Sequence, residues 1–95
     1  MAARPMTMVF CYDVVDDRTR QRVAKALEER AVRVQESVFE ARLSERETGL
    51  LFDRVSRLLN PEDSLRMYAL SASGLARSRV AGGAPLPEDG DYWLI

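Results

Sequence analysis

The sequence predicts an α+β fold in which two helices cover one face of a four-stranded antiparallel sheet. Three observations support this prediction. Apolar runs of strand composition alternate with helical segments, each helical segment begins at strong capping residues, and the elements follow the order strand, helix, strand, strand, helix, strand. This order is the βαββαβ pattern of ferredoxin-like domains. A chain of 95 residues suits one such domain, which we expect to span residues 1–95 with its core at about 6–70.

The first strand is expected at Met6–Val15, "MTMVFCYDVV", which is apolar at both odd and even positions. A strand that is covered on both faces has this composition. Asp16 and Asp17 are suitable N-cap residues for a first helix over about Arg18–Arg30. The apolar stripe that this helix turns toward the sheet consists of Val23, Ala24, Leu27 and Ala31.

The middle of the chain predicts two more strands and a second helix. The segment Ala31–Leu43 alternates in its second half, and we interpret it as two short strands that break near Glu36–Ser37. Ser44 and Glu47 have the spacing of a capping box, so a helix is expected to begin there and to extend to about Leu59.

The last part of the chain predicts one strand, a loop and a terminal strand. Ser64–Leu70 is the fourth strand of the core, and residues 71–90 are expected to be a loop or adaptable segment because Gly, Pro and Ser are frequent there. Asp91–Ile95 is too short to fold alone, and a sheet edge offers it unpaired backbone groups. We expect this segment to add a strand to a neighbouring sheet edge, as at the interface with a second copy, because Tyr92, Trp93, Leu94 and Ile95 would be costly to leave exposed together.

The residue types exclude several kinds of active site. The chain contains no His, which removes His triads, His metal ligands and the usual general base at neutral pH. The single cysteine, Cys11, excludes an intramolecular disulfide and is interpreted as a buried small hydrophobe. No apolar run is long enough to span a bilayer and no signal-peptide pattern is present, so we expect a cytoplasmic protein with no membrane partner.

The charged residues are balanced in number but biased in type. The net charge is −1, and Lys25 is the only Lys among 14 basic residues. Arg binds phosphate through two parallel hydrogen bonds, which fits a nucleic-acid partner. A GC-rich genome produces the same bias, so composition alone does not decide between these explanations.

Four segments, in order along the chain, resemble the small CRISPR-associated spacer-acquisition protein. This family is the smaller of the two core adaptation proteins and is often described as an endoribonuclease. The segments are "YDVVDD" at Tyr12–Asp17, "RTRQRVAKAL" at Arg18–Leu27, "RVQESVFEARLS" at Arg33–Ser44 and "DSLRMYAL" at Asp63–Leu70. The resemblance implies a ferredoxin-like homodimer that acts in CRISPR adaptive immunity, an antiviral defence. It also implies that the tail crosses between subunits or contacts the integrase.

Asp13 is the main candidate for catalysis and metal binding. The resemblance implies that it meets its symmetry mate across the dimer interface, where Asp13 from both subunits binds Mg²⁺ or another divalent cation. Mg²⁺ takes one or two carboxylates and completes its shell with water and phosphate, so this arrangement suits it. Such a metal would activate water for phosphodiester cleavage in a chain without His. The alternative is that Asp13 is a turn residue that ends a strand.

The resemblance assigns further residues by their place in the matching segments. Candidates for nucleic-acid binding are Arg20, Arg22 and Arg33, and supporting positions are Tyr12 and Phe39. Solvated helix positions explain Arg20 and Arg22 equally well, and Tyr12 and Phe39 are also typical core residues. Glu36 departs from the family, which often has Tyr or a basic residue there, and an acid at this position would repel phosphate.

Three functions remain open from the sequence. The first is a homodimer that binds double-stranded DNA and scaffolds the integrase while new spacers are acquired. The second is a Mg²⁺-dependent endonuclease that cleaves RNA or DNA at paired Asp13. The third is a ferredoxin-like regulatory or RNA-binding module in which Asp13 has no chemical role.

Overall fold

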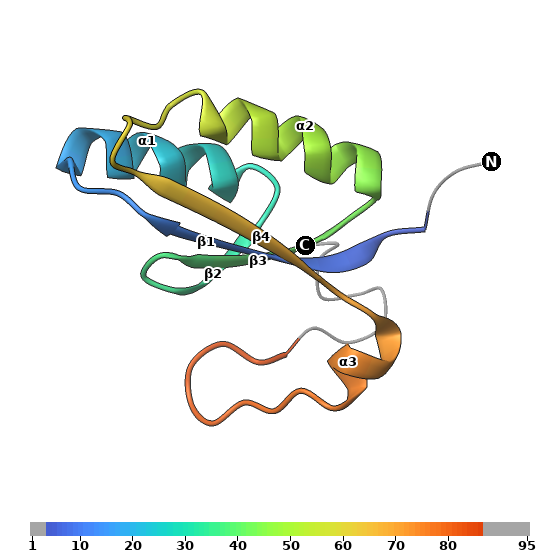
Figure 1. Cartoon of the computed structure of the whole chain (residues 1–95). Coiled ribbons are helices and arrows are strands. Elements are labelled where there is room, and N and C mark those ends of the chain that lie inside the picture. Colours follow the sequence, from blue (N-terminus) through green and yellow to red (C-terminus); the bar gives the residue numbers. More distant parts are fainter. Residues whose placement is uncertain (1–3, 87–95) are drawn as a thin grey trace.

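A computed structural model of the chain describes residues 4–86, which form one four-stranded sheet with helices on both sides (Figure 1). The strands lie in the order β2-β3-β1-β4, and each neighbouring pair is antiparallel. This arrangement confirms the predicted ferredoxin-like α+β fold. In chain order the elements are β1 (Met6–Asp13), α1 (Asp17–Glu28), β2 (Val32–Gln35), β3 (Val38–Leu43), α2 (Glu45–Ser56), β4 (Ser64–Leu70) and α3 (Ala72–Ala76).

Both long helices begin at the capping residues that the sequence indicated. The side chain of Asp16 accepts a hydrogen bond from the Thr19 backbone N–H at 2.9 Å and caps α1. At α2, Ser44 and Glu47 form the predicted capping box, with reciprocal side-chain to backbone bonds of 3.1 and 3.0 Å. Each capped start satisfies backbone N–H groups that have no partner within the helix.

Both long helices end earlier than the apolar periodicity suggested. α1 ends at Glu28 and α2 at Ser56, where the predicted ends were residues 30 and 59. Beyond each end the chain forms a tighter turn, in which the Arg30 N–H bonds to the Leu27 carbonyl and the Leu58 N–H bonds to the Val55 carbonyl. These bonds span three residues and not four, so the apolar pattern continues for a few residues after the α-helix has stopped.

The sheet is covered by α1 and α2 on one face, while α3 and residues 77–86 lie on the other side (Figure 1). We call these the helix face and the open face. Strand side chains alternate between the two faces. On β1 and β3 the helix face receives apolar side chains that are almost completely buried, namely Met8, Phe10, Tyr12, Phe39, Ala41 and Leu43. They pack against buried residues of the helices, among them Val23, Leu27, Leu51 and Val55.

Residues 71–90 were predicted as a loop, and for the part that is described this prediction is incomplete. A short helix, α3, forms over Ala72–Ala76, and its N-cap Ser71 accepts a hydrogen bond from the Gly74 N–H at 3.0 Å. The short capping motif outweighs the glycine and serine content of the segment. Gly82 and Gly83 then adopt φ values of 75° and 74°, a left-handed conformation that favours glycine.

The predicted terminal strand at Asp91–Ile95 lies outside the described residues, so its position stays a prediction. The single-domain boundary at residues 1–95 also stays a prediction. No helix within residues 4–86 is long and apolar enough to cross a membrane.

Candidate functional site

Asp13 is the last residue of β1, directly opposite Ser64 on β4. Its position in the alternation of β1 places it with Val9 and Cys11 on the open face. The Asp13 side chain is exposed and forms no hydrogen bond or ion pair with any residue in the described part of the chain. Its two carboxylate oxygens are therefore available to a ligand outside this chain.

One Asp13 carboxylate is a suitable but incomplete ligand set for a divalent cation. Within residues 4–86 no group of three or more His, Cys, Asp or Glu side chains lies close enough to hold a metal ion. Carboxylate oxygen is nevertheless the donor that Mg²⁺ prefers, and one or two carboxylates with water and phosphate complete its shell. The donor chemistry thus fits Mg²⁺ when a second chain contributes its own Asp13.

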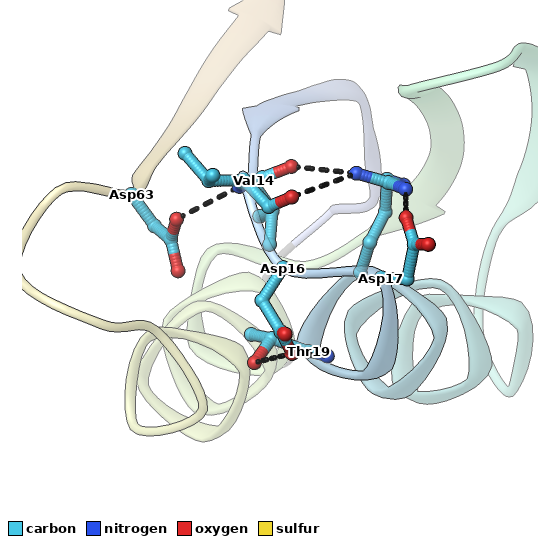
Figure 2. A network of polar contacts seen from close by, with 7 residues as sticks. Val14, Asp16, Asp17, Thr19 and Asp63 are labelled. Atoms are coloured by element: carbon cyan, nitrogen blue, oxygen red, sulfur yellow. Dashed lines mark hydrogen bonds and ion pairs between the residues drawn. The ribbon is translucent and has the colours of Figure 1, made fainter.

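The turn that follows Asp13 is held by two charged side chains (Figure 2). Nη1 of Arg20 donates to the carbonyl of Val14 at 2.9 Å and to that of Val15 at 3.4 Å. From the other side, Oδ1 of Asp63 accepts the N–H of Val15 at 3.1 Å. These bonds explain why β1 ends at Asp13 and not at the predicted Val15, because the next backbone groups bond to side chains instead of strands.

Arg20 has a structural role in addition to its predicted contact with nucleic acid. Its guanidinium forms an ion pair with Asp17, in addition to its two bonds to the turn. The side chain is still 42% exposed, so a phosphate could reach it from solvent. Its role toward nucleic acid stays a prediction.

Asp16 and Asp17, the acids that follow the turn, stabilise the start of α1. Hydrogen bonds from the backbone N–H and the hydroxyl of Thr19 lower the pKa of Asp16. Asp16 is the N-cap, as predicted, and Asp17 is the first residue of the helix. Neither contact involves Asp13.

Tyr12, Phe39 and Arg33 form one cluster on the helix face. The rings of Tyr12 and Phe39 stack with centroids 6.1 Å apart, and Cζ of Arg33 lies 5.2 Å from the centroid of Phe39. The hydroxyl of Tyr12 donates to the carbonyl of Glu36 at 3.2 Å and so fixes the turn between β2 and β3. Burial raises the pKa of Tyr12, while the positive charge of Arg33 opposes this shift. Both rings are buried, which makes them core residues and not an exposed platform for bases.

The three predicted arginines are not equally close to one another. Arg20 bonds to the carbonyl of Val14, and Arg33 lies over the Phe39 ring that stacks on Tyr12, so both lie near the same end of β1. Arg22 is exposed on α1 and forms no ion pair within residues 4–86. No described contact joins Arg22 to the other two.

The sequence pattern did not single out three further arginines that the fold brings together. Arg4, Arg42 and Arg79 line a hollow of about 1060 Å³ between the open face and residues 72–86, and the described lining contains no Asp or Glu. The Thr7 hydroxyl, at the same hollow, is buried without a hydrogen-bond partner among residues 4–86. Alternation along β3 could have indicated Arg42. The other two arginines come from segments without periodicity.

Within residues 4–86 the open face is only partly covered. Val9, Cys11 and Val38 are half-buried there, and Tyr68 is 51% exposed. Oε1 of Glu40 is buried without a hydrogen-bond partner in the described structure, and burial raises the pKa of this carboxyl. An apolar surface with unpaired polar atoms is typical of a face that packs against another molecule.

The free edge of the sheet is also a candidate for contacts. Among the described strands β4 has a neighbour on one side only, β1. A hollow of about 770 Å³ lies beside this edge, between β4 and α2, and its lining includes Met8, Phe52, Leu65 and Met67. An edge strand beside an apolar groove can accept an added strand with apolar side chains.

Comparisons with known proteins agree on one family. Residues 6–77 match the family described as "CRISPR associated protein Cas2". The chain is 44% identical over 89 residues to the CRISPR-associated endoribonuclease Cas2 2 of Synechocystis sp., which covers 92% of this chain and 96% of that protein.

Solved structures show the same similarity in three dimensions. The structure resembles Streptococcus pyogenes Cas2 with a TM-score of 0.69 and 28% identity, covering 81% of this chain and all of the other. It resembles a chain of a partial Cas6-RT-Cas1–Cas2 complex with a TM-score of 0.74 and 26% identity, covering 87% of this chain and 92% of the other.

Proposed function

The chain belongs to the CRISPR-associated Cas2 family, and we propose that it acts in CRISPR adaptation as the partner of the integrase during the acquisition of new spacers. The family match over residues 6–77 carries this proposal. The likeness to a chain of the Cas6-RT-Cas1–Cas2 complex supports Cas1 as the integrase partner. Spacers are inserted into a genomic array, so the proposed place of action is the cytoplasm. The family match disfavours a regulatory or RNA-binding module of unrelated ancestry.

We propose that the working unit is a homodimer formed through the open face. The half-buried apolar residues of β1 and β3 and the buried, unpaired oxygen of Glu40 support this. A second copy that covers this face would remove the apolar surface from water and bring the Asp13 end of each β1 toward the interface.

Double-stranded DNA is the proposed nucleic-acid partner of this dimer. Support comes from Arg22 and Arg33, which are exposed, and from the hollow lined by Arg4, Arg42 and Arg79 without a described carboxylate. Arginine contacts to phosphates release counterions, so affinity should fall steeply as salt increases.

A matched pair of double variants tests the DNA proposal. Arg22→Gln with Arg33→Gln removes two predicted contacts. Arg46→Gln with Arg57→Gln removes two exposed arginines, one in α2 and one at its C-cap, with the same change in charge. A dimer carries four of the first pair's arginines, so the first pair should reduce the slope of log affinity against log salt by about 3.6, while the second should leave it unchanged. Equal slopes for both pairs, or a flat salt dependence of the wild type, would contradict the proposal. Spacer acquisition in cells that also express the integrase then shows whether loss of DNA binding matters in vivo.

A second candidate function is a Mg²⁺-dependent endonuclease at paired Asp13. The relatives named endoribonuclease and endonuclease support it. A bound divalent cation would supply Lewis-acid stabilisation of the phosphate and a water of lowered pKa. In this chain Asp13 would hold the cation, and the exposed arginines would orient the phosphodiester. RNA and duplex DNA are both candidate substrates.

The nuclease proposal is tested with Asp13→Asn, which removes the charge and keeps the shape. We expect loss of all Mg²⁺-dependent cleavage with an unchanged dimer, while Glu62→Gln, a nearby exposed acid, cleaves as wild type does. Assays with RNA and with duplex DNA, each with Mg²⁺ or EDTA, measure this. If Asp13→Asn cleaves as well as the wild type in matched preparations, the scaffold role stands alone.

We further propose that Asp91–Ile95 binds the β4 edge of the second copy or the integrase. The free edge of β4 and the apolar groove beside it support this. Deletion of Asp91–Ile95 should weaken one of these assemblies with nearly unchanged helix content. Sedimentation with and without integrase measures it, and persistence of both assemblies at wild-type concentrations would refute the idea.

A further inference from the structure

The backbone of Val14–Val15 is held from both sides by side chains of opposite charge (Figure 2). Arg20 donates to both carbonyls, and Asp63 accepts the Val15 N–H. Asp63 is 48 residues from Val15 in the sequence, so only the fold brings it there. Strand pairing ends at Asp13, and these bonds replace it in the turn that follows.

Asp63 is itself fixed in place by the loop that precedes β4. Its Oδ2 accepts the N–H of Asn60 at 2.9 Å, and its own N–H bonds to the Asn60 carbonyl at 3.0 Å. The Asn60 amide then donates to the hydroxyl of Thr19 at 3.3 Å, on the first turn of α1. Each oxygen of the Asp63 carboxylate therefore serves a different segment, and the carboxylate joins the loop before β4 to the end of β1.

We propose that Asp63 is a positioning residue for the Asp13 carboxylate, with Arg20 as its counterpart on the other side of the turn. The inference rests on the proposed metal site at paired Asp13. That site takes one carboxylate from each chain, and residues 4–86 hold no metal-binding group of three or more acidic or sulfur side chains that could compensate for a displaced Asp13. Displacement of about 1 Å is enough to weaken a site of this kind strongly. Asp63 also directly precedes Ser64, the β4 residue opposite Asp13, so one segment sets both the pairing of Asp13 and the turn after it.

Mn²⁺ binding to the intact dimer, followed by the electron paramagnetic resonance of free Mn²⁺, tests the proposal without any activity assay. Asp63→Ala loses both acceptor oxygens, and we expect about 10-fold weaker Mn²⁺ binding, as for residues that orient metal ligands. Asp63→Asn keeps one acceptor oxygen and places an NH₂ group at the other, so its affinity should lie between Ala and wild type. Glu62→Gln is the matched control and should bind as wild type does, because Glu62 is exposed and has no described contact.

Three further readouts separate positioning from general stability. Amide exchange at Val15 should accelerate in Asp63→Ala while exchange in the centre of β1 is unchanged. In an Asp13→Asn background, Asp63→Asn should cause no further loss of Mn²⁺ affinity. Arg20→Gln removes the hydrogen bonds to the carbonyls of Val14 and Val15, so it should also weaken Mn²⁺ binding. The exposed Arg18→Gln is its control. Arg20→Gln provides a second variant if Asp63→Ala does not fold.

The outcomes distinguish this inference from the proposal on which it rests. If Asp13→Asn lowers Mn²⁺ affinity but Asp63→Ala and Arg20→Gln do not, the metal site stands and the positioning role is wrong. If Asp63→Ala lowers only the thermal midpoint, its role is structural. If Asp13→Asn leaves Mn²⁺ affinity unchanged, the metal site and the positioning role both fall.

Discussion

The two faces of the sheet are built from the same strands, yet residues 4–86 cover only one of them completely. On the helix face, Phe10 and Phe39 are 0% exposed and belong to the core that also contains Val23 of α1 and Val55 of α2. On the open face, their neighbours Val9 and Val38 are half-buried, and Tyr68 is 51% exposed. The difference arises from what packs on each face, because alternation supplies apolar residues to both.

The polar groups of the two faces differ in whether they have hydrogen-bond partners. On the helix side Glu47 bonds to the Ser44 backbone and to Arg30, at 3.0 and 2.6 Å. On the open face, Glu40 and Thr7 each have a buried oxygen without a described partner. Buried polar atoms without partners are costly, so a protein that keeps them usually covers or satisfies them in an assembly. The comparison therefore indicates that the helix face provides stability, and it supports the proposed association through the open face.

The largest expected effect is on the helix face. Phe10→Ala removes a fully buried ring from the centre of the core and should cost about 3–5 kcal/mol of unfolding free energy. Val9→Ala, one residue away on the open face, should cost much less. Urea denaturation of both variants at one protein concentration measures the difference. Equal losses would show that the two faces contribute alike to stability.

The next effect concerns association. Val9→Asp places a charge in the proposed interface and should convert the dimer to a folded monomer, because an unpaired buried charge opposes packing. Leu50→Asp is the control, since Leu50 is 61% exposed on α2 and lies outside that interface. Sedimentation velocity reports the mass, and circular dichroism reports the fold. A Val9→Asp protein that remains dimeric would place the interface elsewhere.

The smallest expected effects are pH-dependent changes in the thermal midpoint, which have opposite signs for variants of Glu40 and Glu47. Burial raises the pKa of Glu40, so folding takes up a proton and the ionised carboxylate destabilises the protein as the pH rises through its pKa. Glu40→Gln should therefore raise the thermal midpoint at pH 7. This gain should fade as the pH falls through the raised pKa and be absent below the ordinary pKa of Glu, about 4.3.

Glu47 provides the opposite case. The Ser44 N–H, and then Arg30, lower the pKa of Glu47 to about 2. Its contribution is complete above the ordinary pKa of Glu and is lost as the pH falls toward 2. Glu47→Gln should lower the midpoint slightly at pH 7 and match the wild type near pH 2. Thermal scans from pH 2 to 8 measure both variants, and shifts of the same sign would contradict the contrast between the two faces.

The sequence by itself determined the features that depend on near neighbours. The caps at Asp16 and Ser44 act within three residues, and the strand at Ser64–Leu70 follows from composition and alternation. The order of these elements was enough to predict the sheet and its two helices. The strand that carries Asp13 also followed from the local pattern, but its end at Asp13 and not at Val15 did not.

Only the tertiary structure decided which distant residues meet. The bond from Val15 to Asp63 joins residues 48 apart, and Arg4, Arg42 and Arg79 come from three separate segments. It also decided that Arg20 holds the turn after Asp13 and that Tyr12 and Phe39 lie in the core. Periodicity and capping reflect interactions over about four residues, whereas these contacts exist only after the strands have paired and the helices have packed.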